Sequence, residues 1–128
     1  MRKLFVSIPM KDRTEEAIKA SIDKMHKIAE VLEGEKLELL DTYITEMPPE
    51  DCTNKGIWYL SKIFKQLAYA DVFIGITDEH LWRGCQVETD TASRYGIKCY
   101  QVNPRYVIDN YNDLVTTVHD TKLVEVLA

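Results

Sequence analysis

The sequence DVFIGI, at residues 71–76, decides the fold class. Its apolar residues do not alternate with polar ones, which is typical of a strand that is buried on both faces. Strands of this kind belong to parallel sheets that are covered by helices. The segments before and after it are therefore expected to alternate between helix and strand.

Short apolar runs predict three further strands, and helical periodicity predicts helices between them. The first helix should start at a capping box formed by Asp12 and Glu15 and should end at Gly34. The other expected strands are 3–8, 36–43 and 97–102, and the other expected helices are 57–70, 83–96 and 110–128. This order predicts one α/β domain over residues 1–128, with an open, mostly parallel, Rossmann-like (flavodoxin-like) sheet and helices on both faces.

The composition excludes several classes of protein. With 128 residues, of which 45% are hydrophobic and 29% charged, the chain is expected to form a soluble globular domain. The net charge of -5 argues against a nucleic-acid partner, because a phosphate backbone requires a basic face. No apolar run is long enough for a signal peptide or a membrane span, so no membrane partner is expected.

The cysteines and the absence of standard motifs narrow the chemistry further. Cys52, Cys85 and Cys99 are odd in number and lack CxxC spacing, which argues against disulfides or structural zinc and favours a reducing cytoplasm. The chain contains neither GxGxxG nor GxxxxGK[ST], and no carboxylate spacing matches a cation loop. We therefore expect a cytoplasmic protein without a metal or a cofactor.

Parallel α/β sheets bind ligands at the carboxyl ends of their strands. This rule points to three places: residues 7–10 after the first strand, with Ser7, Pro9 and Met10 as candidates, residues 77–88 after the third, and the segment from Asn103 onward after the fourth. These segments are expected to lie together at one edge of the sheet.

Glu88 is the first candidate, because it is expected in the first turn of the helix that starts near Gly84. Two interpretations are open. It is either a surface carboxylate that only stabilises its helix, or a pocket carboxylate. A helix N-terminus would keep it ionised, which suits a nucleophile or a ligand for sugar hydroxyls.

The loop before Glu88 supplies the other candidates. Trp82 and Arg83 are suited to stack on a base and to pair with a phosphate, although packing of the loop onto the body explains Trp82 equally well. Asp78 lies at the ligand end of its strand, where it is either a pocket group or part of a solvated loop.

Three stretches together resemble the nucleoside 2-deoxyribosyltransferase-like superfamily, in particular its small phage- and bacteria-associated branch of unassigned function. They are KLFVSIPM (3–10), YADVFIGI (69–76) and RGCQVETDTASRYGIKCY (83–100). Within the third, the residues that carry the spacing of the family are Gly84, Glu88, Ala92, Gly96 and Lys98.

The resemblance implies that Glu88 attacks the anomeric carbon of a deoxynucleoside and that Gly84 lines the pocket. It also implies a homo-oligomer in which a neighbouring subunit contributes a C-terminal asparagine; Asn103, Asn110 and Asn112 are the candidates. The aspartate that the family places six residues before the glutamate is Trp82 here, so Asp78 is expected in its role.

Two functions follow from this resemblance. The first is cleavage or transfer at the N-glycosidic bond of a nucleoside or nucleotide, with Glu88 as the nucleophile. The second is non-catalytic binding of a nucleotide-like or ADP-ribose-like signal, as in a phage counter-defence sponge or sensor. Arg83 stands where the family has a serine, which favours a phosphorylated ligand in either case.

Overall fold

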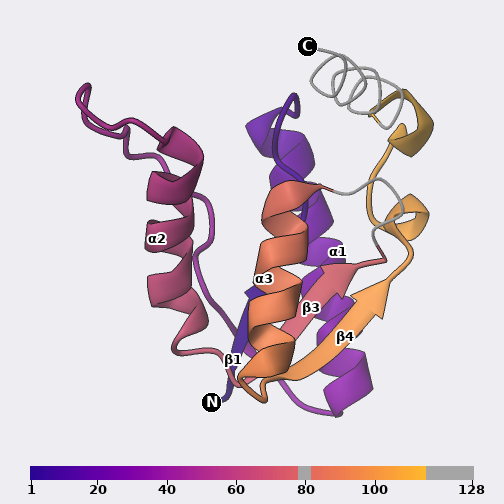
Figure 1. Cartoon of the computed structure of the whole chain (residues 1–128). Helices are drawn as coiled ribbons and strands as arrows, with labels where there is room; N and C mark the ends of the chain where they lie inside the picture. Colours follow the sequence, from indigo (N-terminus) through magenta and orange to yellow (C-terminus); the bar gives the residue numbers. More distant parts are fainter. Residues whose placement is uncertain (78–81, 115–128) are drawn as a thin grey trace.

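The computed structural model describes residues 1–77 and 82–114 and contains four parallel strands in one sheet (Figure 1). The sheet order is β2-β1-β3-β4, which matches the first four strands of the flavodoxin-like order. The elements are β1 Lys3–Val6, α1 Glu15–Glu33, β2 Glu38–Leu39, α2 Lys55–Leu67, β3 Val72–Ile76, α3 Arg83–Arg94, β4 Lys98–Val102 and the 3-10 helix η1 Pro104–Tyr106. The expected open, parallel, Rossmann-like α/β fold is confirmed.

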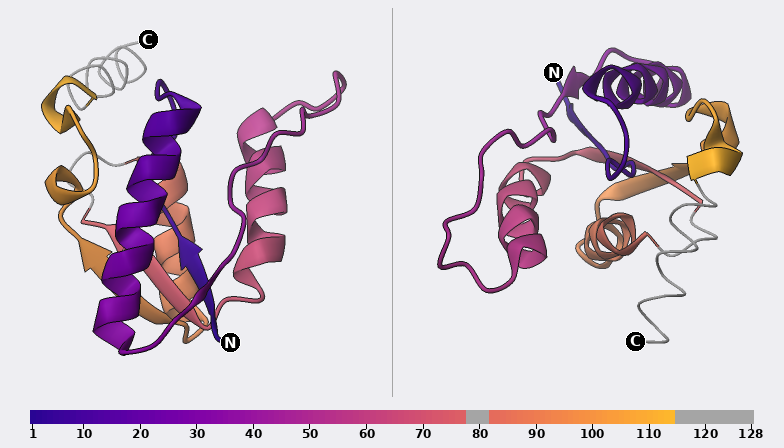
Figure 2. Two further views of the ribbon diagram at one scale, coloured as in Figure 1. Left: turned by 180° about the vertical axis from the view of Figure 1, so that it is seen from behind. Right: turned by 90° about the horizontal axis from the view of Figure 1, so that it is seen from above.

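The helices form a layer on each face of the sheet. Helix α1 covers one face, and α2 and α3 cover the other (Figure 2). Alternate residues of β1 therefore enter different cores: Leu4 packs in the cluster that includes α1, while Phe5 packs against α2 and α3. Phe5 stacks on Phe73 with ring centroids 5.6 Å apart. Both faces of the central strands are buried, as the apolar run of β3 predicts.

Helix α1 begins two residues later than its sequence pattern predicts. Its N-cap is Thr14, whose hydroxyl accepts a hydrogen bond from the N–H of Ala17 at 3.1 Å. The expected cap, Asp12, instead lies in the preceding turn with a φ of 62°. The expected end at Gly34 is confirmed, because this residue closes the helix in the left-handed region with a φ of 70°.

Strand β2 is shorter than the expected strand over 36–43. It lies at the edge of the sheet and pairs only with β1, through Lys3 opposite Glu38 and Leu4 opposite Leu39. The chain then turns away at Asp41, whose carboxylate accepts a hydrogen bond from the N–H of Tyr43 at 3.1 Å. This early turn brings the next segment over the carboxyl end of β1.

The C-terminal part of the chain is described only as far as residue 114. Residues 111–114 are helical, and the rest of the helix expected over 110–128 lies outside the described residues. Within the described ranges, no helix has both the length and the apolar character needed to cross a membrane.

Candidate active site

Glu88 lies in the second turn of α3, because the helix begins at Arg83 with Trp82 as its N-cap. The expectation that it occupies the first turn is therefore wrong. A carboxylate in the second turn gains little from the free N–H groups of the helix end, so the helix dipole does not hold it ionised. The protonation of Glu88 therefore depends on the residues that face its carboxyl group.

A single hydrogen bond links Glu88 to the end of the first strand. The Ser7 hydroxyl donates to Glu88 Oε1 at 2.9 Å. Ser7 is buried and held in place, since its own N–H donates to the carbonyl of Ile74 at 2.9 Å. Two segments that are far apart in sequence, one after β1 and one in α3, therefore meet at the carboxyl end of the sheet.

Gly75 allows α3 to approach β3 closely. A Cβ atom at this position would lie 2.9 Å from Phe73 Cε1 and 3.3 Å from Thr89 Oγ1. Thr89 follows Glu88 directly, so any side chain at residue 75 would press on the turn of α3 that carries the carboxyl group. The glycine thus helps to set the position of Glu88.

The carboxyl group of Glu88 faces a pocket of about 300 Å³ at this edge of the sheet. The lining comes from the end of β1 and the loop after it, from the segment after β2, from α2, and from Trp82 and the first two turns of α3. It comprises Val6, Ile8, Pro9, Met10, Lys11, Thr42, Ile63, Trp82, Arg83, Gly84, Cys85 and Glu88. The wall is mainly apolar, and Lys11 and Arg83 are both exposed at its rim.

The structure brings together most of the predicted site residues. Besides Ser7, which reaches the pocket through its hydrogen bond to Glu88, those on the lining are Pro9, Met10, Trp82, Arg83, Gly84 and Glu88. Sequence analysis missed Lys11, Thr42 and Ile63, and it included Cys85 only within the range 77–88. Thr42 could have been found by applying the strand-end rule to β2 as well.

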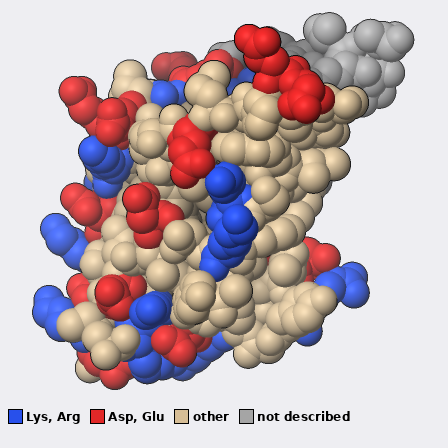
Figure 3. All heavy atoms as spheres, turned by 90° about the vertical axis from the view of Figure 1, so that its left-hand side faces the viewer, with Lys and Arg blue, Asp and Glu red and all other residues tan. Residues whose placement is uncertain are grey.

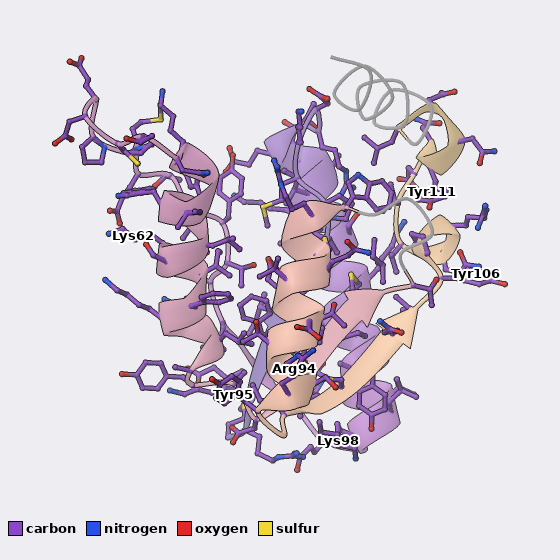
Figure 4. All side chains as sticks on the ribbon, in the orientation of Figure 1. Lys62, Arg94, Tyr95, Lys98, Tyr106 and Tyr111 are labelled. Atoms are coloured by element: carbon purple, nitrogen blue, oxygen red, sulfur yellow. The ribbon has the colours of Figure 1, made fainter. Side chains whose placement is uncertain are left out.

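Trp82 lies in the wall with its ring packed against the body of the protein. It is 7% exposed, and its ring meets that of Tyr111 edge-on with centroids 5.9 Å apart. Tyr111 is buried in turn, whereas Tyr106 on η1 is 79% exposed (Figure 4). Arg105 places its guanidinium over the Tyr111 ring, 5.0 Å from the centroid. Trp82 therefore has a packing role as well as a place on the pocket lining.

The asparagine candidates do not line this pocket. Asn103 caps η1, since its side-chain oxygen accepts a hydrogen bond from the N–H of Arg105 at 3.0 Å. Asn110 and Asn112 line a different depression, beside Arg105. Asp78 lies outside the described residues.

Arg13 supports the wall of the pocket from behind. Its guanidinium donates to the carbonyl of Pro9 at 2.9 Å and to the hydroxyl of Ser21 at 2.6 Å. Burial lowers the pKa of this group from its ordinary value. The contacts tie the loop after β1 to α1 and fix the backbone on which Pro9 and Met10 lie.

Burial in this apolar environment raises the pKa of Glu88 to about 7, although the hydrogen bond from Ser7 acts in the opposite direction. At neutral pH the group therefore populates both its protonated and its ionised form. The protonated form can donate a proton, and the ionised form can act as a nucleophile or stabilise positive charge.

Metal ligation has no support among residues 1–77 and 82–114. No group of three or more His, Cys, Asp or Glu side chains there is arranged to hold a metal ion. Cys85 is buried, and Cys52 and Cys99 are half-buried. Among the described residues, the pocket offers the carboxyl group of Glu88, the hydroxyl of Ser7, the thiol of Cys85 and the two cations at the rim.

These features place a titratable carboxyl group, a buried hydroxyl and a cationic rim around one apolar pocket, where parallel α/β sheets bind ligands. Comparison of the chain with models of protein families, with curated proteins and with solved structures found no match.

Proposed function

We propose that the protein binds a nucleoside or nucleotide in the Glu88 pocket and cleaves, or transfers at, its N-glycosidic bond. The observation that carries the proposal is the hydrogen-bonded pair of Ser7 and Glu88 in an apolar pocket. Such a pocket suits the base and sugar, and the exposed Arg83 and Lys11 at the rim suit a phosphate. The segments that supply Ser7, Arg83 and Glu88 resemble deoxyribosyltransferases, which supports the same chemistry.

In this reaction the ionised Glu88 attacks the anomeric carbon while the bond to the base breaks. The electron pair of that bond leaves with the base, and water or a second base then displaces Glu88 from the sugar. The Ser7 hydroxyl orients the attacking carboxylate through its hydrogen bond. Because the pKa of Glu88 is raised to about 7 by burial, we expect kcat/KM to rise with pH up to about 7 and then to level off.

The test is release of free base from a panel of deoxynucleosides and their 5′-monophosphates, measured by chromatography. We expect Glu88→Gln to lower base release by about 10³-fold or more while it retains ligand affinity, since the side-chain volume is unchanged. Glu16→Gln, at an exposed position of α1, is the matched control. Unchanged turnover in the Glu88 variant would overturn the proposed role.

A second candidate function is non-catalytic binding of a nucleotide-like or ADP-ribose-like signal. It is favoured by Trp82, which packs against Tyr111 and stands where the deoxyribosyltransferases that the chain resembles carry an aspartate. A rise in melting temperature with ligand, without any product after prolonged incubation, would favour this function. Loss of the rise in Arg83→Gln would locate the binding at the rim.

We also propose that the chain acts as a homo-oligomer in the cytoplasm. Helix α2 leaves Ile57 63% exposed and Phe64 36% exposed, and a groove of about 870 Å³ runs beside Phe64 and Tyr95. Figure 3 faces the side that carries α2, where uncharged surface lies between separate positive and negative side chains. Light scattering should detect a dimer or larger species, and Phe64→Lys should shift it to the monomer; a monomer at high concentration would contradict the proposal.

A further inference from the structure

The pocket separates one carboxyl group from two cationic side chains. Glu88 lies against the buried Ser7, while Lys11 and Arg83 are exposed at the rim. Arg83 begins α3 and Glu88 is five residues further on, so they differ by about 7.5 Å along the helix axis at a rise of 1.5 Å per residue. A ligand in the pocket therefore meets a carboxyl group at one end and cations at the other.

In the part of the chain that the structure describes, no Lys, Arg or His side chain forms an ion pair with Glu88. Its hydrogen-bond partner there is the neutral hydroxyl of Ser7. From α2 and from the segment after β2 the pocket receives only neutral groups, Ile63 and Thr42. The thiol of Cys85 is the remaining titratable group on the described lining.

An ionised carboxylate in apolar surroundings needs a compensating charge. Without a ligand, Glu88 meets this need by retaining a proton in part of the molecules at neutral pH, in keeping with the rise of its pKa to about 7 by burial. A ligand that places a positive charge beside Glu88 would supply the compensation and displace the proton. A neutral ligand would not supply this charge, so the pocket should bind a cationic ligand more tightly than a neutral one.

We propose that the preferred ligand is an N-glycoside 5′-monophosphate whose base carries a positive charge at the glycosidic nitrogen. This inference rests on the proposed function and names its substrate class. Glu88 faces the cationic base and the anomeric carbon, and Arg83 and Lys11 pair with the phosphate.

The reaction also fits the groups that line the pocket. Apart from Glu88, the described lining has no carboxylic acid or imidazole to protonate a leaving base. When Glu88 bonds to the anomeric carbon of a cationic base, the electron pair of the broken bond returns to the ring nitrogen and cancels its charge. The base then leaves neutral and requires no proton. Water next attacks the anomeric carbon, loses one proton to solvent, and releases the sugar phosphate and the Glu88 carboxylate.

The experiment compares nicotinamide mononucleotide and its 2′-deoxy analogue with their reduced forms, which keep the sugar and phosphate but have an uncharged ring. Titration calorimetry at pH 7 in two buffers of different ionisation enthalpy measures affinity and proton exchange together. We expect the cationic forms to bind at least about tenfold more tightly and to release more protons than the reduced forms. Glu88→Gln should abolish both differences, and circular dichroism and a melting curve verify its fold.

The rim is tested with nicotinamide riboside, which lacks the phosphate. We expect it to bind about tenfold more weakly than the mononucleotide, and Arg83→Gln should reduce this gap. Arg94→Gln is the matched control, because Arg94 lies at the opposite end of α3 and is paired with Asp90 at 2.9 Å (Figure 4). If the mononucleotide is preferred over the riboside by the same factor in the Arg83 variant and in the wild type, the assignment of the phosphate to this rim is overturned.

The outcomes separate the substrate class from the proposed function. Cleavage of deoxycytidine or deoxyadenosine monophosphate, without binding of the cationic nucleotides, would overturn the inference and leave the proposed function standing. Equal binding of cationic and reduced forms would also overturn it. Charge-selective binding without nicotinamide release would support the ligand class and count against catalysis. Binding of none of these compounds would count against both.

Discussion

The two ends of the sheet each hold a carboxyl group in a different environment. At the amino end, the side chain of Glu33 of α1 is 3% exposed and pairs with Arg2 at 2.7 Å and with Lys98 at 2.8 Å. It also accepts a hydrogen bond from the Tyr100 hydroxyl. At the carboxyl end, Glu88 has only Ser7 as a described hydrogen-bond partner. Figure 4 shows Lys98 at the lower end of the sheet, where β4 begins.

The partners explain why the two groups titrate so differently. Hydrogen bonds from Lys98, Tyr100 and Arg2 lower the pKa of Glu33 to about 2, whereas burial raises the pKa of Glu88 to about 7. A carboxylate whose partners are all supplied by the protein is fixed as a structural group. A carboxylate that lacks a charged partner in the protein is available to a ligand. This is why groups in pockets whose pKa is strongly shifted are candidates for function.

The largest effect on stability is expected at the amino end. Glu33→Gln removes the charge that Arg2 and Lys98 share, so it should lower the melting temperature at pH 7 clearly. Since the pKa of Glu33 is lowered from 4.5 to about 2, its contribution is present above about pH 4.5 and lost as the pH falls toward 2. Glu15→Gln, at an exposed pair with Lys19 on the same helix, is the control. Equal melting temperatures in the two variants would contradict the comparison.

The close approach of α3 to β3 should be the next most sensitive feature. Gly75→Val would force a side chain against Phe73 and Thr89, and we expect it to lower the free energy of unfolding by about 2 kcal/mol, measured by urea denaturation. It should also weaken ligand binding, because Glu88 moves with α3. Gly84→Ala is the matched control for stability, since a Cβ atom there meets nothing within 4 Å. Similar denaturation midpoints for the Gly75 and Gly84 variants would show that the close approach of α3 to β3 does not contribute to stability.

At the carboxyl end, Glu88→Gln should stabilise the fold at high pH. The pKa of Glu88 is raised by burial from 4.5 to about 7, so its favourable contribution is complete below about pH 4.5 and is lost as the pH rises through 7. The neutral glutamine avoids this loss. We therefore expect the free energy of unfolding of the variant to exceed that of the wild type by on the order of 1–2 kcal/mol at pH 8 and to differ little at pH 4. Chemical denaturation at both pH values measures it. A loss of stability at pH 8 would mean that the ionised carboxylate is well compensated.

The smallest effect is expected at Thr42. Its hydroxyl donates to the carbonyl of Val6 over 3.5 Å, which is long for a hydrogen bond, so Thr42→Val should change the free energy of unfolding by less than about 1 kcal/mol. Because Thr42 lines the pocket, the same change should alter ligand affinity more than stability. Calorimetric titration and denaturation of one protein sample compare the two.

The fold could be predicted from the sequence because its signals are local. The apolar run of β3, the glycine at the end of α1 and the periodicity of the helices each depend on neighbouring residues. The short β2 could not be predicted in the same way, since its length depends on pairing with β1. The site shows the same limit. A rule about strand ends found residues after the first and third strands, but Thr42 after β2 was missed. The contact of Trp82 with Tyr111 and the raised pKa of Glu88 arise only from packing between distant segments.

The two tryptophans of the chain give the pocket an optical reporter. Trp82 lies on the pocket lining, in contact with Tyr111, while Trp58 lies on α2 with the ammonium group of Lys62 5.2 Å from its ring centroid. Replacement of Trp58 by phenylalanine would leave Trp82 as the sole indole fluorophore. Its emission would then respond to whatever enters beside Glu88, so occupancy can be followed without a labelled ligand and before any product is identified.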